Sequence, residues 1–131
     1  MRLLLDTHIA LWAIADHPNL GERARALIDD PGNQVFVSAV TVWEIAIKHA
    51  LRPEGPNAMP ITGNQALGWF EAAQFDMLPI SPRHTAAIDT LPPLHADPFD
   101  RLLVAQALTE PLRLLTRDQR VAAYTDLVLL V

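Results

Sequence analysis

The chain has 131 residues, of which 50% are hydrophobic, and this suffices for one domain with a substantial core. Charged residues make up 19% without a long run of like charge, a composition that argues against a disordered chain. The absence of cysteine excludes disulfides and thiolate metal sites, and the net charge of −5 argues against bulk attraction to nucleic acid. Any metal must therefore be bound by oxygen or imidazole.

Short apolar runs alternate with longer stretches of helical spacing, a pattern typical of βαβ units around a parallel sheet. The runs predict strands, in chain order, at residues 2–5, 35–37, 77–80, 112–115 and 127–131. Their hydrophobicity is continuous rather than alternating, as expected for strands buried on both faces. The sequence therefore predicts an α/β fold, with helices on both faces of the sheet and a single domain over residues 1–131.

Apolar residues near helical spacing predict the intervening helices. These are expected at residues 9–15, 21–29, 42–51, 65–74, 82–90 and 98–108. Ser81-Pro82 and Asp97-Pro98 each combine a capping side chain with a proline at the first helical position. The prolines and glycines of residues 52–64 predict a loop between helices.

Acidic residues gather where these elements meet. Asp6 directly follows the first predicted strand, Asp118 lies just beyond the fourth, and Asp97 and Asp100 open a helix. Glu44 falls in the first turns of the helix after residues 35–37. Because active sites of open α/β sheets form at the carboxyl ends of the strands, these side chains are expected to converge on one edge.

Each acid also has a structural interpretation. Asp6 is equally well explained as a helix cap, and Asp97 fits capping better than catalysis. Asp100 would be favoured by the helix dipole, or would pair with a nearby arginine. Glu44 is harder to explain in this way because apolar residues surround it, and a buried carboxylate without a partner is costly.

A cluster of such acids requires a cation. Two carboxylates about 4 Å apart repel by roughly 4 kcal/mol at a protein-like effective dielectric. Oxygen ligands without cysteine favour Mg²⁺ or Mn²⁺ over zinc. Such an ion activates water and stabilises the transition state of phosphoryl transfer, so the sequence favours phosphodiester hydrolysis.

The segments LLLDTHIALWAI, SAVTVWEIAIK, HADPFDRLLVAQAL and LLTRD resemble the PIN-domain family, and VapC-type toxins in particular. The segments span nearly the whole chain in the family's order. The resemblance implies a three-layer sandwich with a central, mostly parallel sheet of four to five strands. It also implies an endoribonuclease that depends on Mg²⁺ or Mn²⁺, forms homodimers and is inhibited by a cognate VapB-type antitoxin.

By the same resemblance, the catalytic and metal-binding acids are expected to be those of the four motifs, with one further acid just upstream of the third. These are Asp6, Glu44, Asp100 and Asp118, with Asp97 as the alternative or additional ligand. Arg101, Arg117 and Thr116 are candidates for contact with the RNA. His8 and His95 lie near the motifs but receive no catalytic role.

Two other interpretations compete with a nuclease. A phosphoaspartate receiver also has an acidic Mg²⁺ pocket, but it needs a lysine after the last strand, and the only lysine here is Lys48. A non-catalytic binding module with the same fold remains the alternative. The sequence shows no signal-peptide region and no membrane span, so a cytoplasmic protein is expected.

Overall fold

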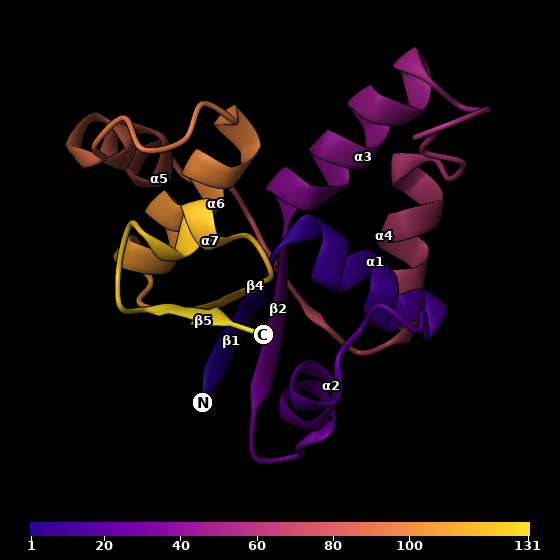
Figure 1. Cartoon of the computed structure of the whole chain (residues 1–131), viewed down its shortest axis with the longest axis horizontal. Helices are drawn as coiled ribbons and strands as arrows, with labels where there is room; N and C mark the ends of the chain where they lie inside the picture. Colours follow the sequence, from indigo (N-terminus) through magenta and orange to yellow (C-terminus); the bar gives the residue numbers. More distant parts are fainter.

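A five-stranded sheet, in which every pair of neighbouring strands is parallel, forms the centre of the molecule (Figure 1). In this computed structural model, which describes residues 1–131, the strands lie in the order β3-β2-β1-β4-β5. Their bounds are β1 Arg2–Leu5, β2 Gln34–Ser38, β3 Asp76–Leu78, β4 Arg113–Thr116 and β5 Val128–Leu130. All five predicted strands are confirmed, with shifts of one or two residues at some ends.

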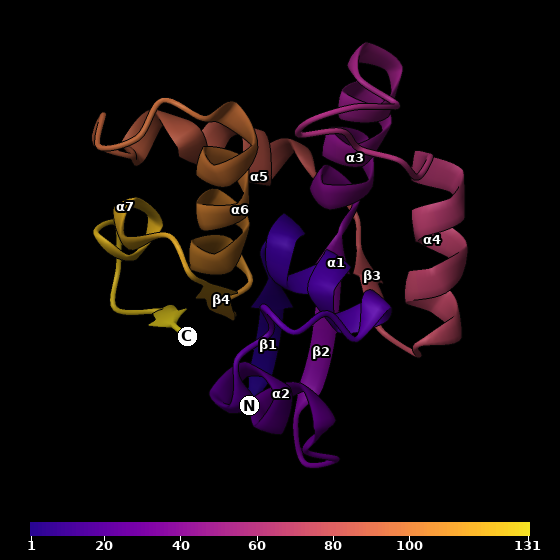
Figure 2. The same ribbon diagram turned by 45° about the vertical axis from the view of Figure 1, so that its right-hand side comes forward.

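Helices cover both faces of the sheet. They are α1 Thr7–Ala15, α2 Glu22–Asp29, α3 Ala39–Leu51, α4 Gly63–Ala72, α5 Pro82–Ala87, the short 3₁₀ helix η1 Ile88–Thr90, α6 Pro98–Thr109 and α7 Gln119–Ala122. Figure 2 shows α6 and α7 on one side of the strands, and α1 and α4 on the other. The predicted α/β sandwich is therefore confirmed. Among the helices, none has the length and hydropathy that a membrane-spanning segment needs.

Some predicted helix boundaries need correction, and one helix was not predicted. The predicted loop 52–64 ends at Thr62, because Thr62 and Gln65 form a reciprocal capping box that starts α4 at Gly63. The predicted helix 82–90 is α-helical only to Ala87 and continues as η1. Helix α7 was missed because its four residues are too few to show helical periodicity.

Successive residues of β1 face opposite sides of the sheet, and so divide the core in two. Leu3 and Leu5 pack in one cluster with Phe70 of α4. Leu4 packs in the other cluster with Leu103 of α6. All five side chains are essentially inaccessible to solvent, which explains the continuous hydrophobicity of the strand sequences.

The order of the strands determines where a site can form. The chain moves outward from β1 through β2 to β3, and then continues on the other side of β1 with β4 and β5. The direction thus reverses between β1 and β4, whose carboxyl ends lie side by side, with Leu5 opposite Leu115. Ligand sites of open α/β sheets occur at such a switch point.

Candidate active site

A small polar cavity of about 130 Å³ opens at the carboxyl edge of the sheet, and no hydrophobic residue lines it. Five carboxylates, two cations, two histidines and one threonine form its walls. These residues are Asp6, Thr7, His8, Glu44, Lys48, His95, Asp97, Asp100, Asp118 and Arg120. This cavity, the acidic pocket, thus brings together all five acids that the sequence indicated as candidate ligands.

Asp6 lies between β1 and α1 and has two structural contacts. Its Oδ1 accepts a hydrogen bond from the backbone N–H of Ile9 at 2.8 Å, which caps α1. Its Oδ2 accepts a hydrogen bond from the hydroxyl of Thr116, at the end of β4. Asp6 is 8% exposed, and burial raises the pKa of its carboxyl group. The capping and ligand interpretations are therefore compatible, because the cap also fixes the carboxylate in the pocket.

Glu44 enters the pocket from α3 and is almost completely buried, as its apolar neighbours predicted. Its Oε1 accepts a hydrogen bond from Thr7 Oγ1 at 2.7 Å. Its Oε2 lies 2.5 Å from Lys48 Nζ, one helical turn further along α3. Lys48 was not predicted as a site residue, although a Glu and a Lys four residues apart on a helix form a recognisable signal.

Asp97 and Asp100 reach the pocket from the first turn of α6. Asp97 Oδ1 caps the helix by accepting the backbone N–H groups of Phe99 at 2.8 Å and Asp100 at 3.1 Å. Asp100 Oδ2 lies 2.8 Å from His95 Nε2 instead of pairing with an arginine. Burial, and then the charge of Asp97, raises the pKa of Asp100 to about 6.

Asp118 is the N-cap of α7, where its Oδ1 accepts the backbone N–H of Arg120 at 2.8 Å. The guanidinium of Arg120 also binds both carboxylate oxygens, from Nε at 3.1 Å and from Nη2 at 2.9 Å. This two-pronged hydrogen bonding holds the pKa of Asp118 below its ordinary value. The Thr116 hydroxyl accepts the N–H of Asp118 at 3.0 Å, which links this acid to Asp6.

The three candidates for RNA contact, Arg101, Arg117 and Thr116, lie outside the lining of the pocket. Arg101 Nη1 donates to the carbonyl of Pro92 and to the hydroxyl of Tyr124, both at 3.0 Å. Arg117 donates to a backbone carbonyl and lies over the ring of Trp12. Thr116 is fully buried. None of the three lines the pocket, whose two cations are Lys48 and Arg120.

The donor set suits a hard divalent cation. The carboxylate pKa values of Asp6 and Asp100 are raised, so the ionised cluster is unfavourable by itself. One ligand atom each from His95, Asp97 and Asp100 lie within 4.8 Å of one another. Carboxylate oxygens are the ligands that Mg²⁺ and Mn²⁺ prefer.

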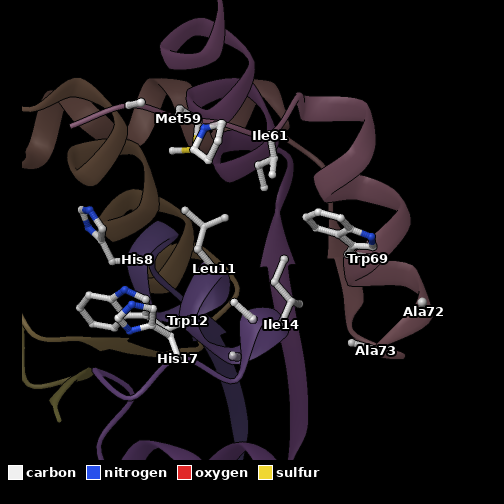
Figure 3. A pocket seen from close by; sticks show the side chains of 14 residues that line it. His8, Leu11, Trp12, Ile14, His17, Met59, Ile61, Trp69, Ala72 and Ala73 are labelled. Atoms are coloured by element: carbon white, nitrogen blue, oxygen red, sulfur yellow. The ribbon is translucent and has the colours of Figure 1, made fainter. Parts of the chain in front are cut away.

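A much larger groove of about 880 Å³ lies beside the pocket, between α1, residues 58–61 and α4 (Figure 3). Hydrophobic residues make up 11 of the 14 that line it. In Figure 3, Leu11 and Ile14 of α1 face Met59 and Trp69 across the groove, whereas Trp12 lies beside His8 and His17. The side chain of His8 lines both cavities, so the apolar groove borders the acidic pocket.

Comparisons with known proteins agree with this arrangement. The family model of the PIN domain matches residues 3–127. The chain is 30% identical over 125 residues to Ribonuclease VapC22 of Mycobacterium tuberculosis, covering 93% of this chain and 91% of that protein.

Solved structures with 18–22% identity share the fold. A VapBC2 complex of Rickettsia felis, bound to a DNA fragment from its promoter, has a TM-score of 0.68 at 18% identity and covers 98% of this chain and 96% of its own. A toxin–antitoxin complex of Klebsiella pneumoniae has a TM-score of 0.63 at 20% identity, with 97% and 95% covered.

Proposed function

The chain belongs to the PIN-domain family, and from this premise we propose that it is an endoribonuclease toxin whose acidic pocket binds Mg²⁺ or Mn²⁺. The observation that carries this proposal is the convergence of five carboxylates, which are distant in sequence, on one hydrophilic cavity at the switch point of the sheet. A relative of similar length is a VapC ribonuclease, which supports RNA as the substrate.

We assign metal binding and catalysis to Asp6, Glu44, Asp100 and Asp118, with Asp97 as a further ligand. When bound, the metal supplies charge stabilisation for the phosphoryl group and an activated water. Thr116 orients the carboxylate of Asp6, and Thr7 orients the carboxylate of Glu44. Both acids are therefore positioned before the metal binds. Such preorganisation favours catalysis because no reorganisation is needed during the reaction.

Lys48 and Arg120 are the two cations of the pocket, and we propose that they bind RNA phosphates there. Both are paired with pocket acids in this structure, Lys48 with Glu44 and Arg120 with Asp118. Their side chains remain substantially exposed, at 42% and 67%. With a net charge of −5, the protein has to bind RNA through such local contacts rather than through its overall field.

The test of this proposal is cleavage of a labelled RNA by the purified protein. We expect the protein to cleave the RNA when Mg²⁺ or Mn²⁺ is present. Cleavage should stop when EDTA chelates the metal and should return when the metal is restored. The Asp100→Asn variant, purified in the same way, measures contaminating ribonuclease. A protein that binds RNA but leaves it intact under all these conditions would instead be the non-catalytic module.

We further propose that a VapB-type antitoxin binds the apolar groove and covers the acidic pocket. Related structures are complexes of toxin with antitoxin. The groove offers an apolar surface of a size that suits an amphipathic helix, and it borders the pocket at His8. A partner seated there would block access to the carboxylates. Expression of the toxin without this partner is expected to slow bacterial growth, and a cytoplasmic site of action belongs to the same proposal.

Two tryptophans offer a matched test of this docking surface. Trp69 lies in the groove and Trp43 outside it, and both are 48% exposed. Trp69→Ser is expected to weaken antitoxin binding by about 30-fold, which corresponds to an interface hot spot of about 2 kcal/mol. Trp43→Ser should leave the affinity unchanged, as measured by isothermal titration. Equal effects of both variants, or no effect of Trp69→Ser, would place the antitoxin elsewhere.

Self-association as a homodimer stays a prediction. Trp43 and Met77 belong to a second exposed apolar surface, on α3 and β3, which is available to a second copy. For dimerisation, Trp43→Ser is the test variant and Trp69→Ser is the control. Trp43→Ser should shift the sedimentation coefficient toward the monomer, whereas Trp69→Ser should not.

A further inference from the structure

His95, which lies near the motifs but received no catalytic role from the sequence, is held in the acidic pocket by hydrogen bonds to its backbone. Its backbone N–H donates to the Tyr124 hydroxyl at 2.8 Å, and that hydroxyl donates back to the His95 carbonyl at 3.2 Å. Arg101 also donates to the Tyr124 hydroxyl, which fixes the tyrosine. The imidazole is 8% exposed, so its position is set by packing and not by solvent.

The imidazole of His95 is aimed at the carboxylates. Nε2 lies 2.8 Å from Asp100 Oδ2 and 3.8 Å from Asp118 Oδ2. Adjacent ligands of an octahedral ion with bonds of 2.0–2.1 Å are about 3.0 Å apart, and opposite ligands are about 4.2 Å apart. The spacing of Nε2 from Asp100 Oδ2 therefore matches that of adjacent ligands on one ion. Its spacing from Asp118 Oδ2 lies between the adjacent and the opposite values, so binding of both to one ion requires a small shift of these side chains.

We propose that His95 is a metal ligand through Nε2, and that it shifts the preference of the site from Mg²⁺ toward Mn²⁺. This inference rests on the proposed function, because it concerns the metal of the same pocket. Mg²⁺ binds almost entirely through oxygen. Nitrogen ligands raise the affinity for divalent transition metals, and Mn²⁺ has the lowest affinity of that series. An imidazole in the ligand set thus strengthens Mn²⁺ binding more than Mg²⁺ binding.

A histidine that only held Asp100 in place would behave differently. By donating a hydrogen bond to the carboxylate, it would support either ion, and its loss would weaken both to a similar extent. The ratio of the Mn²⁺ and Mg²⁺ affinities therefore distinguishes a ligand from a positioning residue. His8 provides the matched control, because it also lines the pocket but is exposed to solvent.

The experiment loads the metal-free full-length protein with Mn²⁺ and records pulsed electron paramagnetic resonance. Hyperfine coupling to a histidine nitrogen is expected in the wild type and in His8→Gln, and its loss is expected in His95→Gln. Competition titrations should show that His95→Gln lowers the Mn²⁺ to Mg²⁺ affinity ratio by about tenfold, a difference of about 1.4 kcal/mol between the two ions. Folding of each variant is checked by circular dichroism.

Three results would overturn the inference. If Mn²⁺ binds without nitrogen coupling, the metal centre stands and His95 is not a ligand. If coupling persists in His95→Gln but disappears in His8→Gln, the nitrogen belongs to His8. If Mn²⁺ does not bind at all, the metal centre of the proposed function fails as well. Should His95→Gln not fold, isotope-labelled histidine in the His8→Gln protein still shows whether the coupled nitrogen comes from a histidine in the pocket.

Discussion

Asp6→Asn is expected to reduce the rate of RNA cleavage by roughly a thousandfold, which corresponds to the loss of about 4 kcal/mol of transition-state stabilisation by the metal. The fold should survive, because asparagine keeps an oxygen that can accept the Ile9 N–H and so preserves the cap of α1. The substitution removes the charge that a divalent ion requires. Single-turnover cleavage of a labelled RNA at saturating enzyme measures the effect.

Asp29→Asn is the matched control for this loss. Asp29 is an exposed residue at the end of α2, and it does not line the acidic pocket. The RNA cleavage rate of Asp29→Asn should stay within about twofold of the wild-type rate, since substitutions of exposed residues outside a site have small effects. If Asp6→Asn retained the wild-type rate while circular dichroism showed a native fold, the assignment of Asp6 as a ligand would fail.

Metal binding should raise the free energy of unfolding by roughly 2.7 kcal/mol at a concentration about 100 times the dissociation constant. For a chain of this length, the melting temperature should rise by several degrees, on the order of 3 °C per kcal/mol. Asp6→Asn should lose most of this rise. In EDTA the variant should be as stable as the wild type or more stable, because burial raises the pKa of Asp6 and its ionised form opposes folding.

The pH dependence of stability has a definite sign. The pKa of Asp100 is raised from its ordinary value of 3.8 to about 6 in the folded protein. Its contribution to the stability of the metal-free protein is therefore present below 3.8 and is lost as the pH rises through about 6. Divalent metal competes with these protons, so the stabilisation by Mg²⁺ should be larger at about pH 7.5 than at about pH 5.

These melts are compared at constant ionic strength, so that general screening of surface charge does not contribute. If Asp6 instead formed an ordinary salt bridge, Asp6→Asn would be less stable than the wild type in EDTA. If Asp6→Asn melted clearly below the wild type in EDTA, and both proteins gained equally from Mg²⁺, Asp6 would serve only as a cap or a salt-bridge partner.

The fold could be predicted because its main signals are local. The apolar run of β1 and the proline after Asp97 at the start of α6 are visible in the sequence and define their elements directly. The acids of the pocket could also be predicted, because a parallel sheet brings the carboxyl ends of its strands to one edge. The family resemblance then indicated which acid of each segment to choose.

The remaining features depend on contacts between segments that are far apart in sequence. Proximity in sequence placed Arg117 near the acids, but its side chain extends over Trp12 on α1. His95 lies beside Asp100 in a loop whose backbone is hydrogen-bonded to the hydroxyl of Tyr124, 29 residues later. The hydroxyl of Thr116 meets Asp6 across 110 residues. No periodicity or spacing encodes these contacts, because they follow from packing of the completed fold.

The central claim is that the metal in the acidic pocket performs the cleavage. Its most direct test measures Mn²⁺ binding and the RNA cleavage rate on one preparation of the wild-type protein, over the same range of Mn²⁺ concentrations. We expect the rate to be negligible in EDTA and to rise with the fractional occupancy of the site, so that both curves share one midpoint. Cleavage at the full rate while the site is still empty would contradict the claim.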